Sequence, residues 1–271
     1  MLFPRAREEL AHETGPLDPA NASVPAGPLS YRRRNGQNQA SRVNSSGENN
    51  DKDLEKSGFV KVNGMQLKVK WVFFDLGSTL IDETAADTRR IKEMISGTDV
   101  TEEAYREKRL EMIREGRNGD LSTIEYFALI KTPWHSEDEV PYPDAVPTLT
   151  KLRRRGYKLG VIANQNYGTE QRLKNWNLHQ LFEVIAASAE LGMEKPDPAI
   201  FEWALKQADC RPQNAVMVGD RMDNDIAPAN RLEIHTVRLK RGLGAYHEPQ
   251  SDDETPEYTI SMLEELLDLL Q

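Results

Sequence analysis

The sequence predicts an α/β fold with a doubly wound, mainly parallel sheet and a helical insertion after its first core strand. Two observations predict it. From residue 58 onward, short apolar segments typical of buried strands alternate with helical segments. Residues 82–142, which follow the first such strand, show only helical patterns. We expect a core of residues 58–81 and 143–271, and an insertion over the carboxyl edge of the sheet.

Residues 1–57 differ from the rest in composition. They are rich in Pro, Gly, Ser and Asn and contain few aromatic residues, so they cannot bury enough apolar surface to offset the entropy lost on ordering. We expect a disordered tail. The chain has neither an apolar run near the ~18 residues that a membrane span needs nor a recognisable secretory signal. Its one cysteine, Cys210, excludes an internal disulfide and is typical of a reducing compartment, so we expect a cytoplasmic protein.

The formal net charge of −9 lies entirely outside the tail, which holds equal numbers of basic and acidic side chains. An acidic body argues against nucleic acid as a partner, because that binding needs a basic surface. We therefore expect neither nucleic acid nor a membrane as a partner, and the sequence does not indicate the oligomeric state.

Apolar, β-branched segments indicate five core strands. They are Lys70–Asp75, Lys158–Ala163, Glu183–Ala187, Ala215–Val218 and Ile234–Val237.

Capping residues indicate the helices between these strands. One helix is expected over Asp144–Arg155, ended by Gly156, and another begins at Asp197-Pro198, an N-cap followed by proline. Within the insertion, Thr101 and the capping box Ser122-x-x-Glu125 predict two helix starts. An amphipathic pattern predicts a closing helix over Tyr258–Leu270.

The first predicted strand ends on a carboxylate, Asp75. After one leucine, Gly77, Ser78 and Thr79 follow. Ligands bind at the carboxyl ends of strands in α/β sheets. A carboxylate there is suited to act as a nucleophile, as a metal ligand or as both, although an Asp that merely starts a turn has the same local pattern.

Three further motifs follow in order. The strand ending at Ala163 leads into Asn164-Gln165-Asn166, Lys195 is flanked by proline just before a helix, and a short apolar strand leads into Gly219-Asp220-Arg-Met-Asp223-Asn-Asp225. Each alone has an ordinary structural interpretation, namely a solvated loop lysine or helix-capping aspartates.

Together, these motifs resemble those of the haloacid dehalogenase superfamily, most of whose members are magnesium-dependent phosphohydrolases with a Rossmann-like core. The resemblance covers residues 70 to about 240, and the helical insertion corresponds to the small cap of one subfamily. It implies that Asp75 attacks phosphorus to form an aspartyl-phosphate and that Lys195 stabilises the phosphoryl group.

The resemblance also implies ligands for Mg²⁺ and for phosphate. Asp75, Asp220 and the Gly77 carbonyl would hold Mg²⁺, and Asp225 would act through water or hold Lys195. The expected phosphate-binding residues are Ser78, Thr79, Asn164 and Lys195.

Two positions depart from the family pattern. Gly77 stands where a second Asp normally protonates the leaving oxygen, and Ala163 stands where Ser or Thr normally binds the phosphoryl group. A general acid–base group typically raises the reaction rate by ~10²–10⁴-fold, so we expect its loss to slow catalysis. Glu83 and Asp87 are candidates to supply the proton, although both also suit a helix start.

The sequence therefore favours a magnesium-dependent phosphatase or phosphotransferase acting on a small phosphorylated metabolite. A non-catalytic binding or regulatory module and a hydrolase at a carbon centre, as in a dehalogenase, stay open as alternatives. Substrate specificity would come from the insertion, with plausible contacts at Arg89, Arg90, Arg117 and Trp134.

Overall fold

A computed structural model of the chain describes residues 58–62 and 65–270, and the expected tail of residues 1–57 lies outside them. The main sheet of the described part has six strands, all paired in parallel, in the order β10-β9-β8-β3-β6-β7. Its strands are β3 (Trp71–Phe74), β6 (Lys158–Ala163), β7 (Val184–Ala187), β8 (Ala215–Gly219), β9 (His235–Leu239) and β10 (Tyr258–Ile260). Two antiparallel pairs stand apart from it, β1 (Gly58–Val62) with β2 (Met65–Val69) and β4 (Ile81–Asp82) with β5 (Val140–Pro141).

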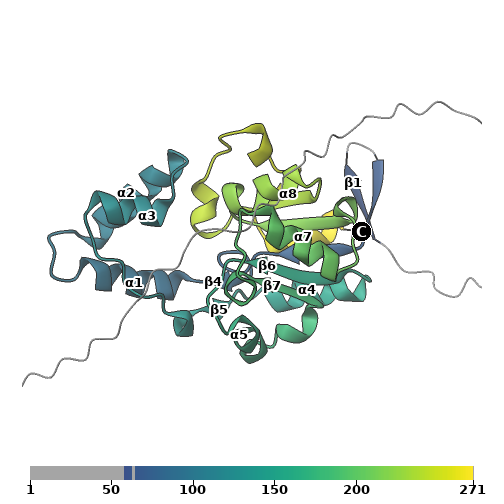
Figure 1. Cartoon of the computed structure of the whole chain (residues 1–271), viewed down its shortest axis with the longest axis horizontal. Helices are drawn as coiled ribbons and strands as arrows, with labels where there is room; N and C mark the ends of the chain where they lie inside the picture. Colours follow the sequence, from purple (N-terminus) through teal and green to yellow (C-terminus); the bar gives the residue numbers. More distant parts are fainter. Residues whose placement is uncertain (1–57, 63–64, 271) are drawn as a thin grey trace, which may run out of the picture. The chain divides into compact units, whose positions relative to one another are not determined.

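The helices alternate with these strands. They are α1 (Thr84–Ile95), α2 (Glu102–Arg114), α3 (Gly119–Tyr126), α4 (Ala145–Arg154), α5 (Thr169–Asn175), α6 (Ser188–Leu191), α7 (Pro198–Gln207), α8 (Ala227–Arg231) and α9 (Leu266–Leu269). Figure 1 shows β6 and β7 of the main sheet, with α4 and α7 beside them. Short 3₁₀ helices lie at Ser136–Asp138, His179–Leu181, Pro212–Asn214, Gly242–Tyr246, Asp252–Glu254 and Leu263–Glu265, and a π-helical turn lies at Met222–Ile226. Within residues 58–62 and 65–270, no helix combines the length and the apolar character needed to cross a membrane.

The strand order places β3 in the middle of the sheet. From β3 the chain adds β6 and β7 on one side, and then returns to add β8, β9 and β10 on the other. The direction of winding therefore reverses between β3 and β8, and such a reversal opens a crevice at the carboxyl ends of the strands. The expected doubly wound α/β fold is confirmed.

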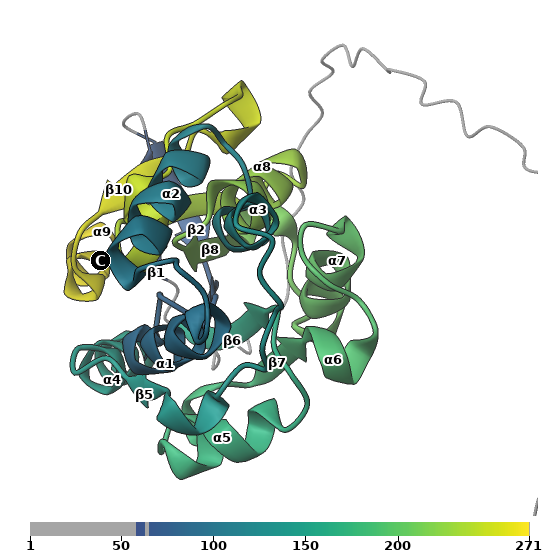
Figure 2. The same ribbon diagram turned by 90° about the vertical axis from the view of Figure 1, so that its left-hand side faces the viewer.

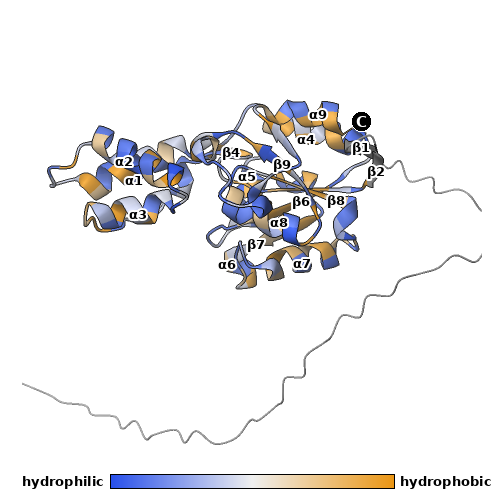
Figure 3. Ribbon diagram, turned by 90° about the horizontal axis from the view of Figure 1, so that it is seen from above, coloured by the Kyte–Doolittle hydropathy of each residue, from blue (hydrophilic) through white to orange (hydrophobic). Residues whose placement is uncertain are grey.

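Helices cover both faces of the sheet. Leu149 of α4 and Leu266 of α9 belong to one buried apolar cluster, whereas Phe201 of α7 and Ala229 of α8 belong to another. Figure 3 shows α4 and α9 on one side of the strands and α7 on the other. With both faces buried, the strands need continuous apolar runs, which explains why the sequence shows them.

Helices α1, α2 and α3 lie between β4 and β5, so the insertion leaves and rejoins the core through that antiparallel pair. Figure 2 shows the three helices grouped together. Ile91, Met94, Tyr105 and Ile124 form a small apolar cluster of their own. We keep the name cap for the predicted insertion of residues 82–142.

Local capping signals were mostly correct. The Thr101 hydroxyl accepts from the Ala104 amide at the start of α2, and the Asp197 carboxylate accepts from Ala199 at the start of α7. The start predicted at Ser122 was wrong, because α3 begins at Gly119 with Asn118 as its cap.

The closing helix predicted over Tyr258–Leu270 was also wrong. Its first residues form β10, which pairs in parallel with β9, and only Leu266–Leu269 form an α-helix. An edge position on the sheet satisfies the backbone of residues 258–260 and buries Ile260, so the tertiary contact outweighs the helical pattern.

Candidate active site

Asp75 lies at the carboxyl end of β3, where the sheet reverses its winding. Its backbone amide donates to the carbonyl of Val218 on β8 at 2.9 Å, which fixes the two strand ends side by side. Asp220 follows β8 directly, and Asn164 follows β6, the other neighbour of β3. Three polar residues predicted from separate motifs thus meet at one edge.

Lys195 lies between two carboxylates. Its Nζ donates to Asp75 Oδ1 at 2.7 Å and to Asp225 Oδ1 at 2.5 Å, and its side chain is 2% exposed. The Asn164 side chain holds the lysine backbone at both ends, because Nδ2 donates to the Lys195 carbonyl and Oδ1 accepts from the Lys195 amide. Asn164 therefore positions Lys195 with its Oδ1 and one N–H of its amide group, and the phosphate contact expected of it stays a prediction.

The carboxylates of Asp75, Asp220 and Asp225 fit a divalent cation. One oxygen from each lies within 4.8 Å of the others. Asp220 is buried, and no hydrogen bond or ion pair reaches its carboxylate from the described residues. A buried carboxylate without a partner is unfavourable, whereas oxygen ligands of this kind suit Mg²⁺.

Asp225 is the least available of the three. Oδ1 accepts from Lys195, and Oδ2 accepts from the Arg221 amide at 3.0 Å. The arrangement fits direct ligation by Asp75 and Asp220, with Asp225 holding the lysine.

The crowding of carboxyl groups changes their protonation. Burial, followed by the neighbouring Asp225 and Asp75, raises the pKa of Asp220 well above its usual value. Burial also raises the pKa of Asp225 to about 6, although the Lys195 ammonium opposes this. For Lys195, burial alone would lower the pKa, but Asp225 and Asp75 outweigh burial and raise it, so the ammonium stays charged. The single Lys195 ammonium therefore does not balance the negative charge of the three carboxylates at this edge of the sheet.

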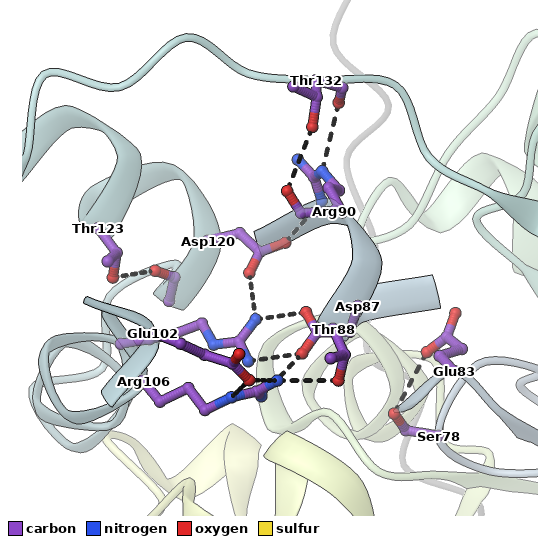
Figure 4. Close-up of polar contacts among 12 residues, drawn as sticks. Ser78, Glu83, Asp87, Thr88, Arg90, Glu102, Arg106, Asp120, Thr123 and Thr132 are labelled. Atoms are coloured by element: carbon purple, nitrogen blue, oxygen red, sulfur yellow. Dashed lines mark hydrogen bonds and ion pairs between the residues drawn. The ribbon is translucent and has the colours of Figure 1, made fainter. Parts of the chain in front are cut away.

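Glu83 adds a fourth carboxyl group. It lies just before α1 and accepts a hydrogen bond from the Ser78 hydroxyl at 3.3 Å (Figure 4). Burial, together with the charges of Asp75 and Glu139, raises the pKa of Glu83 to about 8. The sequence had offered Glu83 as a candidate acid, and the structure places it in the cavity.

Most of the predicted site residues line one cavity of about 680 Å³. They are Asp75, Gly77, Ser78, Asn164, Lys195, Asp220 and Asp225. Thr79 is the exception, because it is fully buried, does not line the cavity, and leaves its hydroxyl without a hydrogen-bond partner. No phosphate contact is therefore available from the Thr79 side chain.

The cap supplies the opposite wall of this cavity. Of the four contacts expected there, Arg90, Arg117 and Trp134 line it, whereas Arg89 lies outside it and pairs with acidic residues of the cap. Lys131 and Tyr142 also line it, and the sequence gave no signal for either, because only tertiary packing brings them to this wall.

Three arginines of the cap are held by acidic side chains (Figure 4). Arg109 donates to both oxygens of Asp87, at 2.6 and 2.8 Å, and to Asp120 at 3.1 Å. Arg106 also reaches Asp87, and Arg90 reaches Asp120. Asp87, the second candidate acid, is thus bound to two arginines and does not stand free in the cavity.

Comparison with known proteins gives a consistent result. The family model of haloacid dehalogenase-like hydrolases matches residues 72–239. A glyceraldehyde 3-phosphate phosphatase of Methanopyrus kandleri is 34% identical over 227 residues, covering 75% of this chain and 97% of that protein. The enzyme of the same name from Methanothermobacter thermautotrophicus is 30% identical, covering 73% of this chain and all of that protein.

Solved structures agree in fold. A phosphatase of this family from Thermococcus onnurineus superposes with a TM-score of 0.53 at 24% identity, covering 74% of this chain and 97% of that chain. The YfnB hydrolase of Bacillus subtilis, solved with magnesium, gives 0.56 at 18% identity, with the same coverage of both chains. Matched over most of its described length in sequence and in fold, the chain belongs to the haloacid dehalogenase-like hydrolases.

Proposed function

We propose that this protein is a magnesium-dependent phosphatase that acts on a small sugar phosphate, with glyceraldehyde 3-phosphate as the first candidate. The observation that carries the proposal is the grouping of Asp75, Lys195 and the unpartnered Asp220 carboxylate at one end of the cavity. Relatives of 30–34% identity that carry the name glyceraldehyde 3-phosphate phosphatase support the substrate.

The charges at the sheet edge suit phosphoryl transfer. Asp75 is the nucleophile, and the Lys195 ammonium at 2.7 Å both orients it and offsets negative charge on the phosphoryl oxygens. Mg²⁺ bound by Asp75 and Asp220 would neutralise further charge on those oxygens. Asn164 and Asp225 keep Lys195 in place, because they hold its backbone and its ammonium group.

The cavity suits a short anionic substrate. Its volume of about 680 Å³ falls within the range typical of small-molecule sites. On the cap side, Lys131 is exposed and Arg117 has only a 3.8 Å contact with the exposed Glu115, so both cations are available to a polar substrate. Cap cations that already have partners, such as Arg109, are not.

Release of inorganic phosphate from a panel of phosphorylated metabolites tests the proposal. The panel contains glyceraldehyde 3-phosphate, glycerol 3-phosphate, phosphoglycolate and phosphoserine, each assayed with Mg²⁺ and with a chelator. We expect the highest kcat/KM for glyceraldehyde 3-phosphate, loss of activity with the chelator, and recovery when Mg²⁺ is restored. Full activity in the chelator would exclude the metal. Tight Mg²⁺ binding without release of phosphate from any substrate would instead favour a non-catalytic module.

A further inference from the structure

Gly77 leaves a space beside Asp75, and the Glu83 carboxyl group fills it. A Cβ atom built on Gly77 would lie 2.5 Å from Glu83 Oε1 and 2.6 Å from Oε2. The backbone of Gly77 lies outside the left-handed region, so a side chain would be compatible with its conformation. A side chain at residue 77 would therefore require the end of the Glu83 side chain to move.

Helix capping does not explain the position of Glu83. Glu83 is the residue that precedes α1, but its side chain makes no capping hydrogen bond. Asp82 does this instead, because its Oδ1 accepts from the Thr84 amide at 2.9 Å. The Glu83 side chain is left to face the cavity, where it lies among the residues that line it.

Among the carboxyl groups that line the cavity, Glu83 is in an unusual position. Asp87 and Asp120 pair with arginines, as described above. Glu139 accepts from Trp134 Nε1 at 2.6 Å, and Glu194 is exposed to solvent. Glu83 has only the Ser78 hydroxyl, and no cation among the described residues pairs with it.

A phosphatase that uses Asp75 needs a proton donor at this place. Transfer of the phosphoryl group leaves an alkoxide, which is a poor leaving group unless it receives a proton as the bond breaks. Asp75 is the proposed nucleophile, Asp220 the proposed metal ligand, and Asp225 holds Lys195. Of the carboxyl groups that the described residues place in the cavity, Glu83 is therefore the one left for this role.

We propose that Glu83 is the general acid and base of the reaction and takes the place left empty by Gly77. The proposal rests on the phosphatase function proposed above. In the first step, Asp75 attacks phosphorus, the bond to the leaving oxygen breaks, and that oxygen takes the Glu83 proton. In the second step, water attacks the aspartyl-phosphate and gives a proton to Glu83, and the electron pair of the broken bond returns to Asp75. Phosphate is released with Glu83 protonated again.

The Glu83→Gln protein tests this role by its dependence on the leaving group. An alkyl phosphate needs the proton and nitrophenyl phosphate does not, so kcat/KM should fall by about 10²–10⁴-fold for the first and by less than about tenfold for the second. Hydrolysis of the aspartyl-phosphate loses its base with either substrate. We therefore expect a burst of product, followed by slow turnover, and phosphorylated Asp75 detectable by mass spectrometry. Glu202→Gln is the matched control, the same change at an exposed residue of α7 that does not line the cavity, and should leave both substrates unaffected.

A rescue experiment separates this role from a structural one. Glu83→Ala should lose alkyl phosphatase activity, and adding Gly77→Asp should recover it by placing a carboxyl group in the vacated space. Gly77→Asp alone should bring little gain, because the new carboxyl group would only displace the Glu83 carboxyl group that already lies there. Circular dichroism and thermal melting establish that each variant is folded.

The outcomes distinguish this inference from the function on which it depends. If the native protein hydrolyses both substrates and Glu83→Gln changes neither their ratio nor the level of phosphoenzyme, the role of Glu83 is overturned and the phosphatase stands. If the native protein hydrolyses neither substrate, the phosphatase function fails, and the role of Glu83 fails with it.

Discussion

The cap and the edge of the sheet each gather charged side chains against the same cavity, but they balance them differently. In the cap, Arg90, Arg106 and Arg109 are matched by Asp87 and Asp120 through hydrogen bonds and ion pairs. At the sheet edge, Asp75, Asp220 and Asp225 lie close together with a single lysine, Lys195, which contacts Asp75 and Asp225. Glu83, from the first residues of the cap, lines the same cavity as a fourth carboxyl group, with no cation paired to it among the described residues.

This difference separates a structural cluster from a functional one. Buried charges that have partners hold elements together, and removing one partner leaves the other buried and uncompensated. Burial, and after it neighbouring charges of the same sign, raise the pKa of Asp220 and of Glu83, and such groups destabilise the fold until a cation or a proton arrives. The sheet edge is therefore arranged for a ligand, and the cap cluster is arranged for its own helices.

The comparison is tested most strongly by Asp75→Asn. We expect phosphatase activity to fall by at least about 10⁴-fold, because loss of the covalent nucleophile costs other hydrolases more than that. The free energy of unfolding should change little, since the substitution also relieves crowding among carboxylates. Steady-state kinetics and urea denaturation measure the two effects, with Asp253→Asn at the exposed Arg231 ion pair as the matched control. If Asp75→Asn kept its activity, the carboxylates at the sheet edge would not be the functional cluster that we propose.

Arg109→Met should have the opposite profile, with its largest effect on stability. The Arg109 side chain is 2% exposed and holds both Asp87 and Asp120, so its loss leaves two carboxylates without their main cation. We expect the free energy of unfolding to fall by about 3–5 kcal/mol, the range typical of a broken buried ion pair. Urea denaturation measures it. A second variant, Arg109→Met with Asp87→Leu, should recover part of the loss, and failure to recover any would show that packing rather than charge dominates.

Asp220→Asn should stabilise the metal-free protein. Removing one charge from the crowded sheet edge relieves repulsion on the order of 1 kcal/mol, so the free energy of unfolding should rise in the presence of a chelator. The same change should abolish stabilisation by added Mg²⁺, because Asp220 is the carboxylate left without a partner. Thermal melting with and without Mg²⁺ measures both effects. A lower melting temperature in the chelator would contradict the idea that this cluster is repulsive.

His235, on β9 of the core, is a titratable group that has a partner, unlike Asp220 at the sheet edge, and we expect a small effect from its loss. Its hydrogen bond to Glu257, at 2.8 Å, raises the pKa of His235 in the folded state, and burial only partly opposes this. Because the folded pKa lies above the unfolded one, the stabilisation is fully present below the unfolded value of 6.5 and is lost as pH rises through the folded pKa. His235→Asn should therefore lower the free energy of unfolding by about 0.5–1 kcal/mol at pH 5.5 and have little such effect at pH 9. Equal losses at both pH values would mean that the contact is not ionic.

Several parts of the site were predictable from the sequence because their signals are local. An apolar run that ends on Asp75, a second that ends before Asp220, and a capped helix just after Lys195 each show in a few consecutive residues. Parallel strands bring such ends to one edge, so the meeting of these residues followed from the fold class. The family resemblance then indicated their chemistry.

Other features depended on contacts between distant segments. The pairing of Arg109 with Asp87 joins α2 to α1, and Asn164 reaches Lys195 across 31 positions of the chain. Composition and periodicity do not specify which acid meets which base, because many pairings are compatible with the same helices.

The sequence by itself determined most of the order of strands and helices and the places of Asp75, Lys195 and the acidic loop along it, since each is encoded by hydrophobic runs and capping residues close together in the chain. The roles proposed for these residues came from the family resemblance. Only the tertiary structure decided that residues 258–260 form an edge strand and that Asn164 supports Lys195. It also decided that the Glu83 carboxyl group fills the space beside Gly77. Each of these depends on where a separate segment packs, and the free energy of that packing outweighs the local preference of the residues concerned.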